Sequence, residues 1–235
     1  MSTPLLRVAP CSAQAARFAC DQWHYSHAFP AGRRSNYGVW EGDRFVGAVV
    51  FSRGACRWLG RAYGLAGHEV CELTRVALRS HEAPVTQIVS RALALLKESS
   101  PGLRLVVSFA DPNAGHHGGI YQAGNWTYTG QSDAVTMFRD KYGRVWHPRQ
   151  VSHNGRVVMF NRLAYNAKRS ECTPLKVPGK HRYLMPLDRS MRRLVAKLAQ
   201  QPPGRGGLDG EPPALRVGGA GSTPAPGSMP EAAHG

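Results

Sequence analysis

The sequence predicts an α/β domain organised around one strand–helix–strand unit. Residues 70–78 are rich in β-branched side chains, which favour strands. The segment after Pro84 repeats its apolar residues with helical spacing, at Val85, Ile88, Val89, Ala92 and Leu96. Residues 103–110 form an almost continuous apolar run, as expected of a strand covered on both faces. A strand, helix and strand of these lengths predict parallel neighbours joined by a right-handed crossover.

Two further elements are expected before this unit. The alanine-rich periodicity of residues 10–23 predicts a first helix. Residues 37–40 and 44–51 are strand-like and flank Glu41-Gly42-Asp43, which signals an antiparallel hairpin. Residues 53–67 are rich in Gly and Arg without periodicity, so a loop is expected there.

The segments after the unit predict three divisions of the chain. Strands are expected at residues 127–130 and 135–139, and residues 189–200 resemble a basic amphipathic helix. The Gly, Pro and Ala of the last residues bury too little surface to order that segment. We therefore expect a catalytic core in residues 1–138, a basic extension packed on that core in 139–201, and a disordered tail in 202–235.

The charge of the chain points to a polyanionic partner. Its 235 residues carry 30 Lys and Arg against 15 Asp and Glu, a net charge of +15. Residues 139–197 alone hold 15 of those cations and three acids, interleaved with Tyr142, Trp146, Tyr165 and Tyr183. A solvated charged face would also be basic, but the density and the aromatic side chains favour nucleic acid. The cations expected to bind DNA are Arg139, Lys141, Arg144, Arg149, Lys180, Arg182, Arg192 and Arg193.

Apolar runs and cysteine spacing bear on where the protein is located and on whether it binds zinc. No apolar run approaches the roughly 20 residues of a membrane span, and the first residues lack the pattern of a signal peptide. We expect a cytoplasmic protein without a membrane partner, in the host cytoplasm if a phage encodes it. The five cysteines are irregularly spaced without a close pair, so reduced, mostly buried thiols are expected rather than a structural zinc site.

Four fragments together resemble a known family. They are His24-Tyr25-Ser26, residues 72–76 (ELTRV), residues 108–112 (SFADP) and residues 118–122 (GGIYQ). With the hairpin and the run into Gly124-Asn125-Trp126, they resemble the GCN5-related acetyltransferase fold, a mixed sheet flanked by helices. Within that fold they are most similar to the Mom-like family of phage DNA-modification enzymes. The resemblance implies conversion of adenine in double-stranded DNA to N6-carbamoylmethyladenine, which protects phage DNA from restriction.

One loop departs from that fold. Its ordinary members carry a glycine-rich loop before the helix, where backbone N–H groups hold the pyrophosphate of an acyl-CoA. Residues 79–84 here read RSHEAP, without glycine and with a proline that lacks an N–H. The resemblance therefore does not imply an ordinary acyl-CoA grip, and the small-molecule donor is left open.

The catalytic candidates are His24, Tyr25, Asp111 and Tyr121. His24 and Tyr25 lie just past the first helix, where they could instead be an aromatic plug packed against the sheet. Asp111 follows the second parallel strand at its carboxyl end, where α/β sheets place ligands, although Asp-Pro-Asn is also good turn chemistry. A carboxylate there would remove a proton from an amine or bind a metal. His24, Tyr25, Asp111 and Tyr121 would suit iron better than zinc as ligands. Alternatively, the two tyrosines carry protons or stack on a flipped base.

Three residues are expected to bind anions, and two rival functions are compatible with the sequence. Arg75 would need an anion if its strand is central, but would be an ordinary solvated charge on an edge strand. Ser108 is a weaker candidate that could simply be buried and hydrogen-bonded, and Arg79 is also expected to bind an anion. The first rival function is an acyl-CoA-dependent N-acetyltransferase acting on RNA or on a protein amine. The second is a non-catalytic DNA-binding protein that kept an enzyme fold. The oligomeric state is not predicted.

Overall fold

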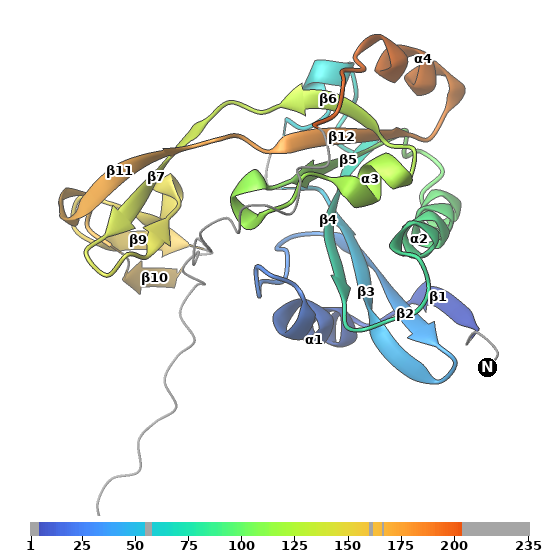
Figure 1. Ribbon diagram of the computed structural model, residues 1–235, viewed down its shortest axis with the longest axis horizontal. Helices are drawn as coiled ribbons and strands as arrows, with labels where there is room; N and C mark the ends of the chain where they lie inside the picture. The colour runs from blue at the N-terminus through green and yellow to red at the C-terminus, as the bar shows by residue number, and fades with distance from the viewer. Residues whose placement is uncertain (1–4, 55–57, 160–161, 166, 204–235) are drawn as a thin grey trace, which may run out of the picture.

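The centre of the molecule is a seven-stranded mixed sheet (Figure 1). The computed structural model describes residues 5–54, 58–159, 162–165 and 167–203. The sheet has the order β1-β2-β3-β4-β5-β12-β6. Its strands are β1 (Leu6–Pro10), β2 (Arg34–Glu41), β3 (Arg44–Ser52), β4 (Val70–Leu78), β5 (Leu105–Ala110), β6 (Thr127–Gln131) and β12 (His181–Pro186). Only β4 and β5 are parallel neighbours; the other adjacent pairs in this sheet are antiparallel.

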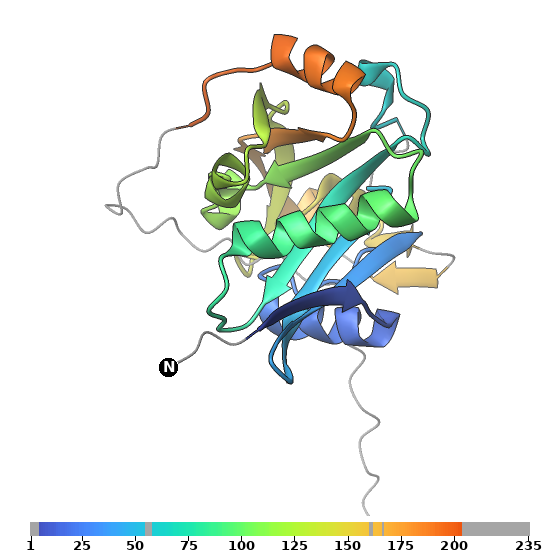
Figure 2. The same cartoon turned by 90° about the vertical axis from the view of Figure 1, so that its right-hand side faces the viewer.

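Helices cover both faces of this sheet because its strands are apolar on both sides. The helices are α1 (Ala13–Trp23), α2 (Val85–Ser99), α3 (Gly119–Ala123) and α4 (Arg189–Lys197). Successive strand residues point to opposite faces. Val106 of β5 packs in one core cluster with α2 and α3, whereas Leu105 and Val107 pack with α4. Alternate residues of β3 divide in the same way between α2 and α1. Figure 2 shows α2 lying across the sheet.

The predicted fold class is confirmed, and most elements lie where the sequence placed them. The strand at 70–78 has the predicted bounds, α2 follows Pro84, and β4 and β5 are parallel. The hairpin of β2 and β3 is antiparallel. The sequence did not reveal β1 or β12 of the central sheet, or the later strands at residues 145–146, 156–159, 162–165 and 172–177. The residues that pair with β1 lie 27 to 35 positions away along the chain, and those that pair with β12 lie 50 to 81 positions away, so neither strand is marked by a local turn.

Residues 132–180 form an arm that leaves the sheet after β6 and returns through β12 (Figure 1). Its three-stranded sheet has the order β11-β7-β8, from β7 (Val135–Asp140), β8 (Val145–Trp146) and β11 (Cys172–Val177). A second hairpin pairs β9 (Arg156–Met159) with β10 (Arg162–Tyr165). Phe138, Trp146 and Val151 form a small core of the arm's own.

The expected division at residue 138 does not coincide with the edge of the central sheet. Strand β12 belongs to the range 139–201, yet it lies between β5 and β6. Residues 139–201 are therefore partly arm and partly core. The expectation of a disordered tail concerns residues that lie almost wholly outside the described part of the chain.

The four described cysteines are free thiols, and two of them, Cys11 and Cys172, are partly exposed although mostly buried thiols were expected. Cys20 and Cys71 are buried, and burial raises the pKa of the Cys71 thiol to about 12. Cys56 lies outside the described residues. No helix within the described residues has the length and apolarity needed to cross a bilayer.

We predict that Gly118→Ala destabilises the protein more than Gly64→Ala does. Both glycines have positive φ, +85° and +67°, where a Cβ costs about 1–2 kcal/mol. A Cβ on Gly118 would also overlap the ring of the fully buried Tyr183, whereas one on Gly64 meets no atom within 4 Å. Overpacking adds about 1–3 kcal/mol. Urea unfolding measures the two losses, and equal losses would contradict this account of Gly118.

Candidate active site

The two parallel strands separate at their carboxyl ends. Strands β4 and β5 pair from Val70 and Leu105 as far as Leu73 and Ser108, and no later residue of β4 pairs with β5. Beyond that point β4 follows β3, with an irregularity in register between Val50 and Phe51. Side chains from other segments therefore have room at this end of the sheet, where open α/β sheets bind ligands.

Asp111 lies at this end and is paired with Lys180. It caps the short helix of Pro112–Ala114, accepting hydrogen bonds at Oδ1 from the backbone N–H and the side-chain amide of Asn113, both at 3.0 Å. Its Oδ2 lies 3.1 Å from Nζ of Lys180. The antiparallel register explains the pair, because His181 of β12 stands opposite Ala110 of β5. Burial raises the Asp111 pKa, but the Lys180 charge and these hydrogen bonds hold it below its usual range.

His24 ends α1 and is buried, with 8% of its surface exposed. Its Nδ1 accepts a hydrogen bond from the backbone N–H of Ser26 at 3.1 Å and contacts the Ser26 hydroxyl at 2.8 Å. Since a backbone N–H can only donate, the neutral ring carries its proton on Nε2. Burial, and then the charge on Arg75, lowers the pKa of His24 to about 3. The ring is therefore neutral at physiological pH.

The aromatic side chain of Tyr25 lies beside the Asp111 carboxylate. About half of Tyr25 (52%) is exposed, and its ring lies 4.4 Å from that of His24 and 4.7 Å from that of His116, centroid to centroid. Partial burial raises the pKa of its hydroxyl, Lys180 and Arg75 oppose the rise, and Asp111 adds to it. These electrostatic effects place Tyr25 within reach of all three charged groups.

Tyr121 is buried at the point where the strands separate. Its hydroxyl lies 2.8 Å from Oγ of Ser108, which lies 2.9 Å from the carbonyl oxygen of Leu73. Because a carbonyl can only accept, Ser108 gives its single proton to Leu73 and the Tyr121 hydroxyl donates to Ser108. Burial raises the pKa of Tyr121 to about 12. It is a protonated, fixed donor next to Tyr25, whose charge also affects its pKa.

The two predicted anion-binding arginines lie in different places. Arg75 donates from Nε to the Ala28 carbonyl at 2.9 Å and from Nη1 to the Thr74 carbonyl at 2.7 Å. It fixes the segment after α1 against β4 and adds positive charge near His24 and Tyr25. Arg79 is exposed, with its guanidinium 5.7 Å from the Trp23 ring centroid. No described contact joins Arg79 to these residues.

The structure therefore brings together the predicted polar cluster, His24, Tyr25, Arg75, Asp111 and Tyr121. Lys180 and His116 also belong to it. The sequence suggested Lys180 only as a DNA contact, because a strand register that joins it to Asp111 is not visible from composition. His116 stood in a His-His-Gly-Gly run that signals a loop, and only its ring contact with Tyr25 reveals its place.

The polar cluster does not present free metal ligands as it stands. The Nδ1 atom of His24 is occupied, both Asp111 oxygens are paired, and the Tyr121 proton is committed to Ser108. Within the described residues, no group of three or more His, Cys, Asp or Glu side chains is placed to hold a metal. Loading of iron would require Lys180 to leave Asp111 and the proton of His24 to move. The iron remains a prediction.

The start of α2 holds a carboxylate of the protein itself. Oε1 of the buried Glu41 accepts the backbone N–H groups of Glu82 and Ala83, at 2.7 and 2.8 Å. Its Oε2 lies 2.8 Å from Arg44. Burial raises the Glu41 pKa, but these bonds hold it below its usual value. Two N–H groups next to this helix are thus already paired with an anion.

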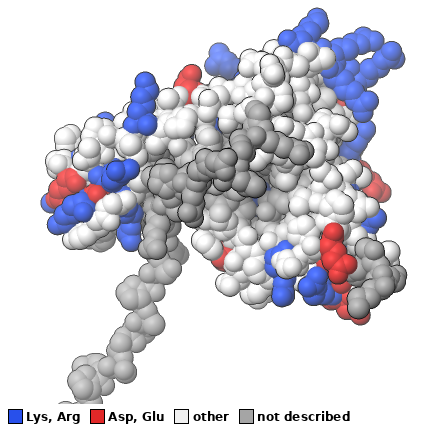
Figure 3. All heavy atoms as spheres, in the orientation of Figure 1, with Lys and Arg blue, Asp and Glu red and all other residues white. Residues whose placement is uncertain are grey.

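The predicted DNA-binding cations gather in two places, the arm and α4 (Figure 3). Arg139, Lys141, Arg144 and Arg149 are exposed on the arm, and Arg192 and Arg193 are exposed on α4. Lys180 is exposed but paired with Asp111. Arg182 is only partly exposed, because it donates to Oγ1 of Thr129 at 3.0 Å and to its carbonyl at 2.9 Å.

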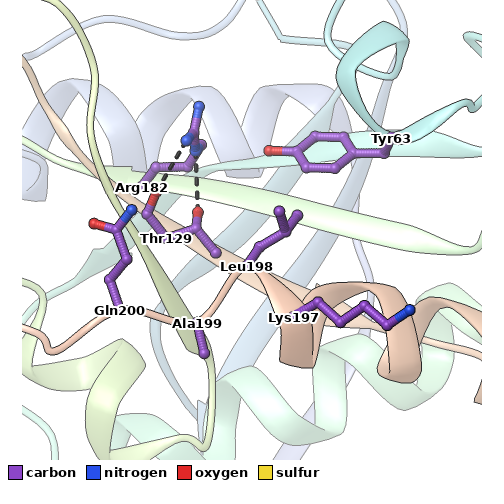
Figure 4. Close-up of a pocket in the computed structure, with 7 residues that line it drawn as sticks. All are labelled: Tyr63, Thr129, Arg182, Lys197, Leu198, Ala199 and Gln200. Atoms are coloured by element: carbon purple, nitrogen blue, oxygen red, sulfur yellow. Dashed lines mark hydrogen bonds between the residues drawn. The ribbon is translucent and has the colours of Figure 1, made fainter.

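Arg182 lines a hollow of about 270 Å³ away from the polar cluster (Figure 4). Its other lining residues are Tyr63, Thr129, Lys197, Leu198, Ala199 and Gln200. Tyr63 packs in the core cluster beneath α4, on the face opposite Tyr121. No residue of the polar cluster lines this hollow, so it is separate from the candidate active site.

Comparison with known proteins identifies relatives by sequence. A model described as the Mom protein family matches residues 5–203. The methylcarbamoylase Mom of Escherichia phage Mu is 27% identical over 203 residues, which cover 84% of this chain and 83% of the phage protein.

Solved structures give a weaker likeness. A Bacillus subtilis acetyltransferase in complex with CoA has a TM-score of 0.40 and 12% identity, covering 78% of this chain and all of that one. The spermidine/spermine N-acetyltransferase of Vibrio cholerae has a TM-score of 0.42 and 10% identity, covering 80% and 96%. Scores below 0.5 carry no information about substrate or cofactor.

We predict that His24→Gln flattens the acid dependence of stability. The unfolded ring binds a proton below about pH 6.5, whereas the folded ring stays neutral until about pH 3. The unfolded state then binds more protons, so wild-type stability falls as pH decreases through this window. Glutamine does not titrate and removes the effect. Urea unfolding at pH 6.5, 5.5 and 4.5 measures it, and identical slopes in the two proteins would show that His24 protonates in the folded state.

Proposed function

The chain belongs to the Mom protein family, and from this membership we propose that it modifies adenine in double-stranded DNA by transferring a carbamoylmethyl group to N6. The relative from phage Mu is named a methylcarbamoylase, which is a group-transfer activity. The polar cluster at the separated ends of β4 and β5 is the observation that carries the proposal. It joins an ionised carboxylate, a half-exposed tyrosine and a buried, neutral histidine.

Access to adenine requires the base to leave the helix stack. Tyr25 is half exposed next to the rings of His24 and His116, and its aromatic side chain can stack on an extruded base. The positive charges of Arg75 and Lys180 beside it favour the phosphates of the same nucleotide. Protection of phage DNA from restriction would follow from altered adenines at the recognition sites.

Asp111 is suited to handle the proton of the amine. Its carboxylate is ionised and accepts a hydrogen bond from an N6–H group. As N6 forms its bond to the donor carbon, the leaving group departs with its electron pair and the nitrogen becomes cationic. Such a nitrogen is strongly acidic, so even a carboxylate of low pKa accepts its proton. Asp111 becomes available when Lys180, half of whose side chain is exposed, moves to a DNA phosphate.

The donor is a small molecule of unassigned class. Two backbone N–H groups at the start of α2 already bind Glu41, and Pro84 offers no N–H. This arrangement disfavours a donor that needs a pyrophosphate at that helix. It counts against the rival acyl-CoA-dependent N-acetyltransferase on RNA or a protein amine. Iron remains part of the proposal as a metal ion. The polar cluster would have to rearrange to bind it.

We predict that Asp111→Asn abolishes the modification. Expression of the wild-type protein should yield a deoxyadenosine heavier by one carbamoylmethyl group, detected by mass spectrometry of nucleosides. Loss of the carboxylate should reduce its amount at least about a hundredfold. Asp133→Asn, which neutralises an exposed carboxylate of the arm, is the matched control and should leave the yield unchanged.

The outcomes of this experiment separate the rival functions. Full yield from Asp111→Asn removes Asp111 from the chemistry. Acetylated RNA or protein without modified DNA supports the acyltransferase rival. A third outcome supports a non-catalytic DNA-binding protein: the wild type leaves DNA unmodified, and Asp111→Asn and Tyr25→Phe retain every phenotype of the wild type. Undiminished yield from fully chelated, metal-free protein excludes iron.

We predict that Arg192→Ala with Arg193→Ala flattens the salt dependence of duplex binding. Each phosphate contact contributes about 0.9 to the slope of log K against log salt. Both arginines are exposed on α4, so the double variant should lose one to two units. Lys97→Ala, which removes an exposed charge from α2, should leave the slope unchanged. Fluorescence anisotropy over a range of salt measures both, and an unchanged slope in the double variant excludes α4 from the interface.

A further inference from the structure

The turn between β7 and β8 holds a tyrosine that the proposed chemistry does not use. Tyr142 exposes 83% of its surface, more than any other large apolar side chain among the described residues. Exposed tyrosines are common on mobile loops, where they imply nothing. The turn around Tyr142 is instead braced by several hydrogen bonds.

Asp140 provides that bracing. Its Oδ1 accepts the backbone N–H groups of Tyr142 and Arg144, and its Oδ2 accepts Nε1 of Trp146, all at 2.9 Å. Backbone hydrogen bonds join Asp140 to Arg144 and Gly143 to Asp140, at 2.9 and 3.0 Å. Gly143 has a φ of +78°, which this tight turn requires. The ring of Tyr142 is therefore held outward on a fixed support.

The support is also strongly basic. Residues 135–177 contain nine Lys and Arg and two acids. One acid, Asp140, is occupied within the turn, and the other, Glu171, lies 3.4 Å from Nζ of Lys168. Nζ of Lys141 lies 5.1 Å from the Tyr142 ring centroid, and Arg144 stacks 5.3 Å from that of Trp146. An outward aromatic ring with flanking cations matches the chemistry of nucleic acid, in which stacked bases lie between phosphates.

The arm also has a suitable reach. The backbone N–H of Ser132 donates to the Lys180 carbonyl, and the chain runs from there through β7 to Tyr142. Ten residues at about 3.3 Å each span at most roughly 33 Å, close to the 34–36 Å of one turn of duplex. Since Lys180 is paired with Asp111, the arm starts beside the polar cluster, and its tip lies at most about one helical turn from that start.

We infer that residues 141–144 are a DNA-binding tip. Tyr142 stacks against an exposed base or sugar of the duplex within one turn of the target adenine. Lys141 and Arg144 bind the adjacent phosphates. This inference rests on the proposed function for its partner, double-stranded DNA. It assigns affinity to the arm and leaves the chemistry to the polar cluster.

The test measures binding of a labelled 30-base-pair duplex by fluorescence anisotropy at several salt concentrations. Tyr142→Ala should weaken binding about five- to hundredfold, since stacking on one base contributes about 1–3 kcal/mol. It should leave the salt slope unchanged, because no charge is lost. Lys141→Ala should instead flatten the slope by about one unit. Tyr142→Phe should retain most of the affinity, because the ring remains.

A matched control separates this tip from exposed aromatic surface in general. Phe18→Ala removes a ring that is 51% exposed on α1 and should not change affinity. Circular dichroism of Tyr142→Ala should equal that of the wild type, because the bracing uses only the backbone of Tyr142. Wild-type affinity in Tyr142→Ala would overturn the inference. So would a flattened salt slope in that variant, or a preference for single-stranded RNA that is lost with the ring.

Failure of the inference and failure of the proposed function give different results. If the wild type modifies adenine and Tyr142→Ala binds duplex equally well, the tip is wrongly assigned and the function stands. If no modified adenine forms but Tyr142→Ala loses duplex affinity at constant slope, the tip is supported and the chemistry is wrong.

Discussion

The separation of β4 and β5 is the constraint on which the rest of the site depends. Two parallel strands that paired along their whole length would leave no space between their carboxyl ends. Here pairing stops at Leu73 and Ser108, and Ser108 closes the last step by donating its proton to the Leu73 carbonyl. The same hydroxyl accepts Tyr121, so the feature that ends the ladder also fixes a buried donor at the opening. Arg75 holds the segment after α1 against β4 through its hydrogen bond to the Ala28 carbonyl.

Electrostatics at this opening combine neutral and ionised groups at short range. Burial keeps His24 neutral and Tyr121 protonated, whereas Lys180 keeps Asp111 ionised in spite of burial. The cluster thus offers one anion, two cations and the Nε2–H donor of His24. Its charges are not permanently neutralised within the protein, because half of the Lys180 side chain is exposed and can exchange Asp111 for solvent or phosphate. A nucleotide, with an amine to be deprotonated and a phosphate to be held, has the complementary pattern.

Much of this could be predicted from local patterns, and the remainder depends on contacts between distant segments. Residues 70–110 gave the strand, helix and parallel strand because β-branched composition, helical spacing and an apolar run are local signals. His24, Tyr25, Asp111 and Tyr121 were identified as a group, and the structure brings them together, although their roles stay predictions. Strand β12 has no such signal: its partners are β5 and β6, and its six residues lie within a basic stretch. Missing β12 meant missing that Lys180 faces Asp111 and that Arg182 turns inward to Thr129. Arg79 was also predicted to bind an anion, and its guanidinium lies 5.7 Å from the Trp23 ring centroid.

The place of β12 in the sheet has a consequence for how the chain matures. Because this late strand is inserted between two earlier ones, the ribosome must release nearly the whole polypeptide before β6 can join β5 through it. Until then β5 has an open edge with unsatisfied backbone groups, and such distant pairing slows folding. The arm is consequently an insertion between two strands of the sheet, not a domain added after it. A nonsense codon anywhere in the arm would remove β12, which joins β5 to β6, as well as the rest of the arm. An internal deletion that connects β6 directly to β12 would instead leave all seven strands of the central sheet in place.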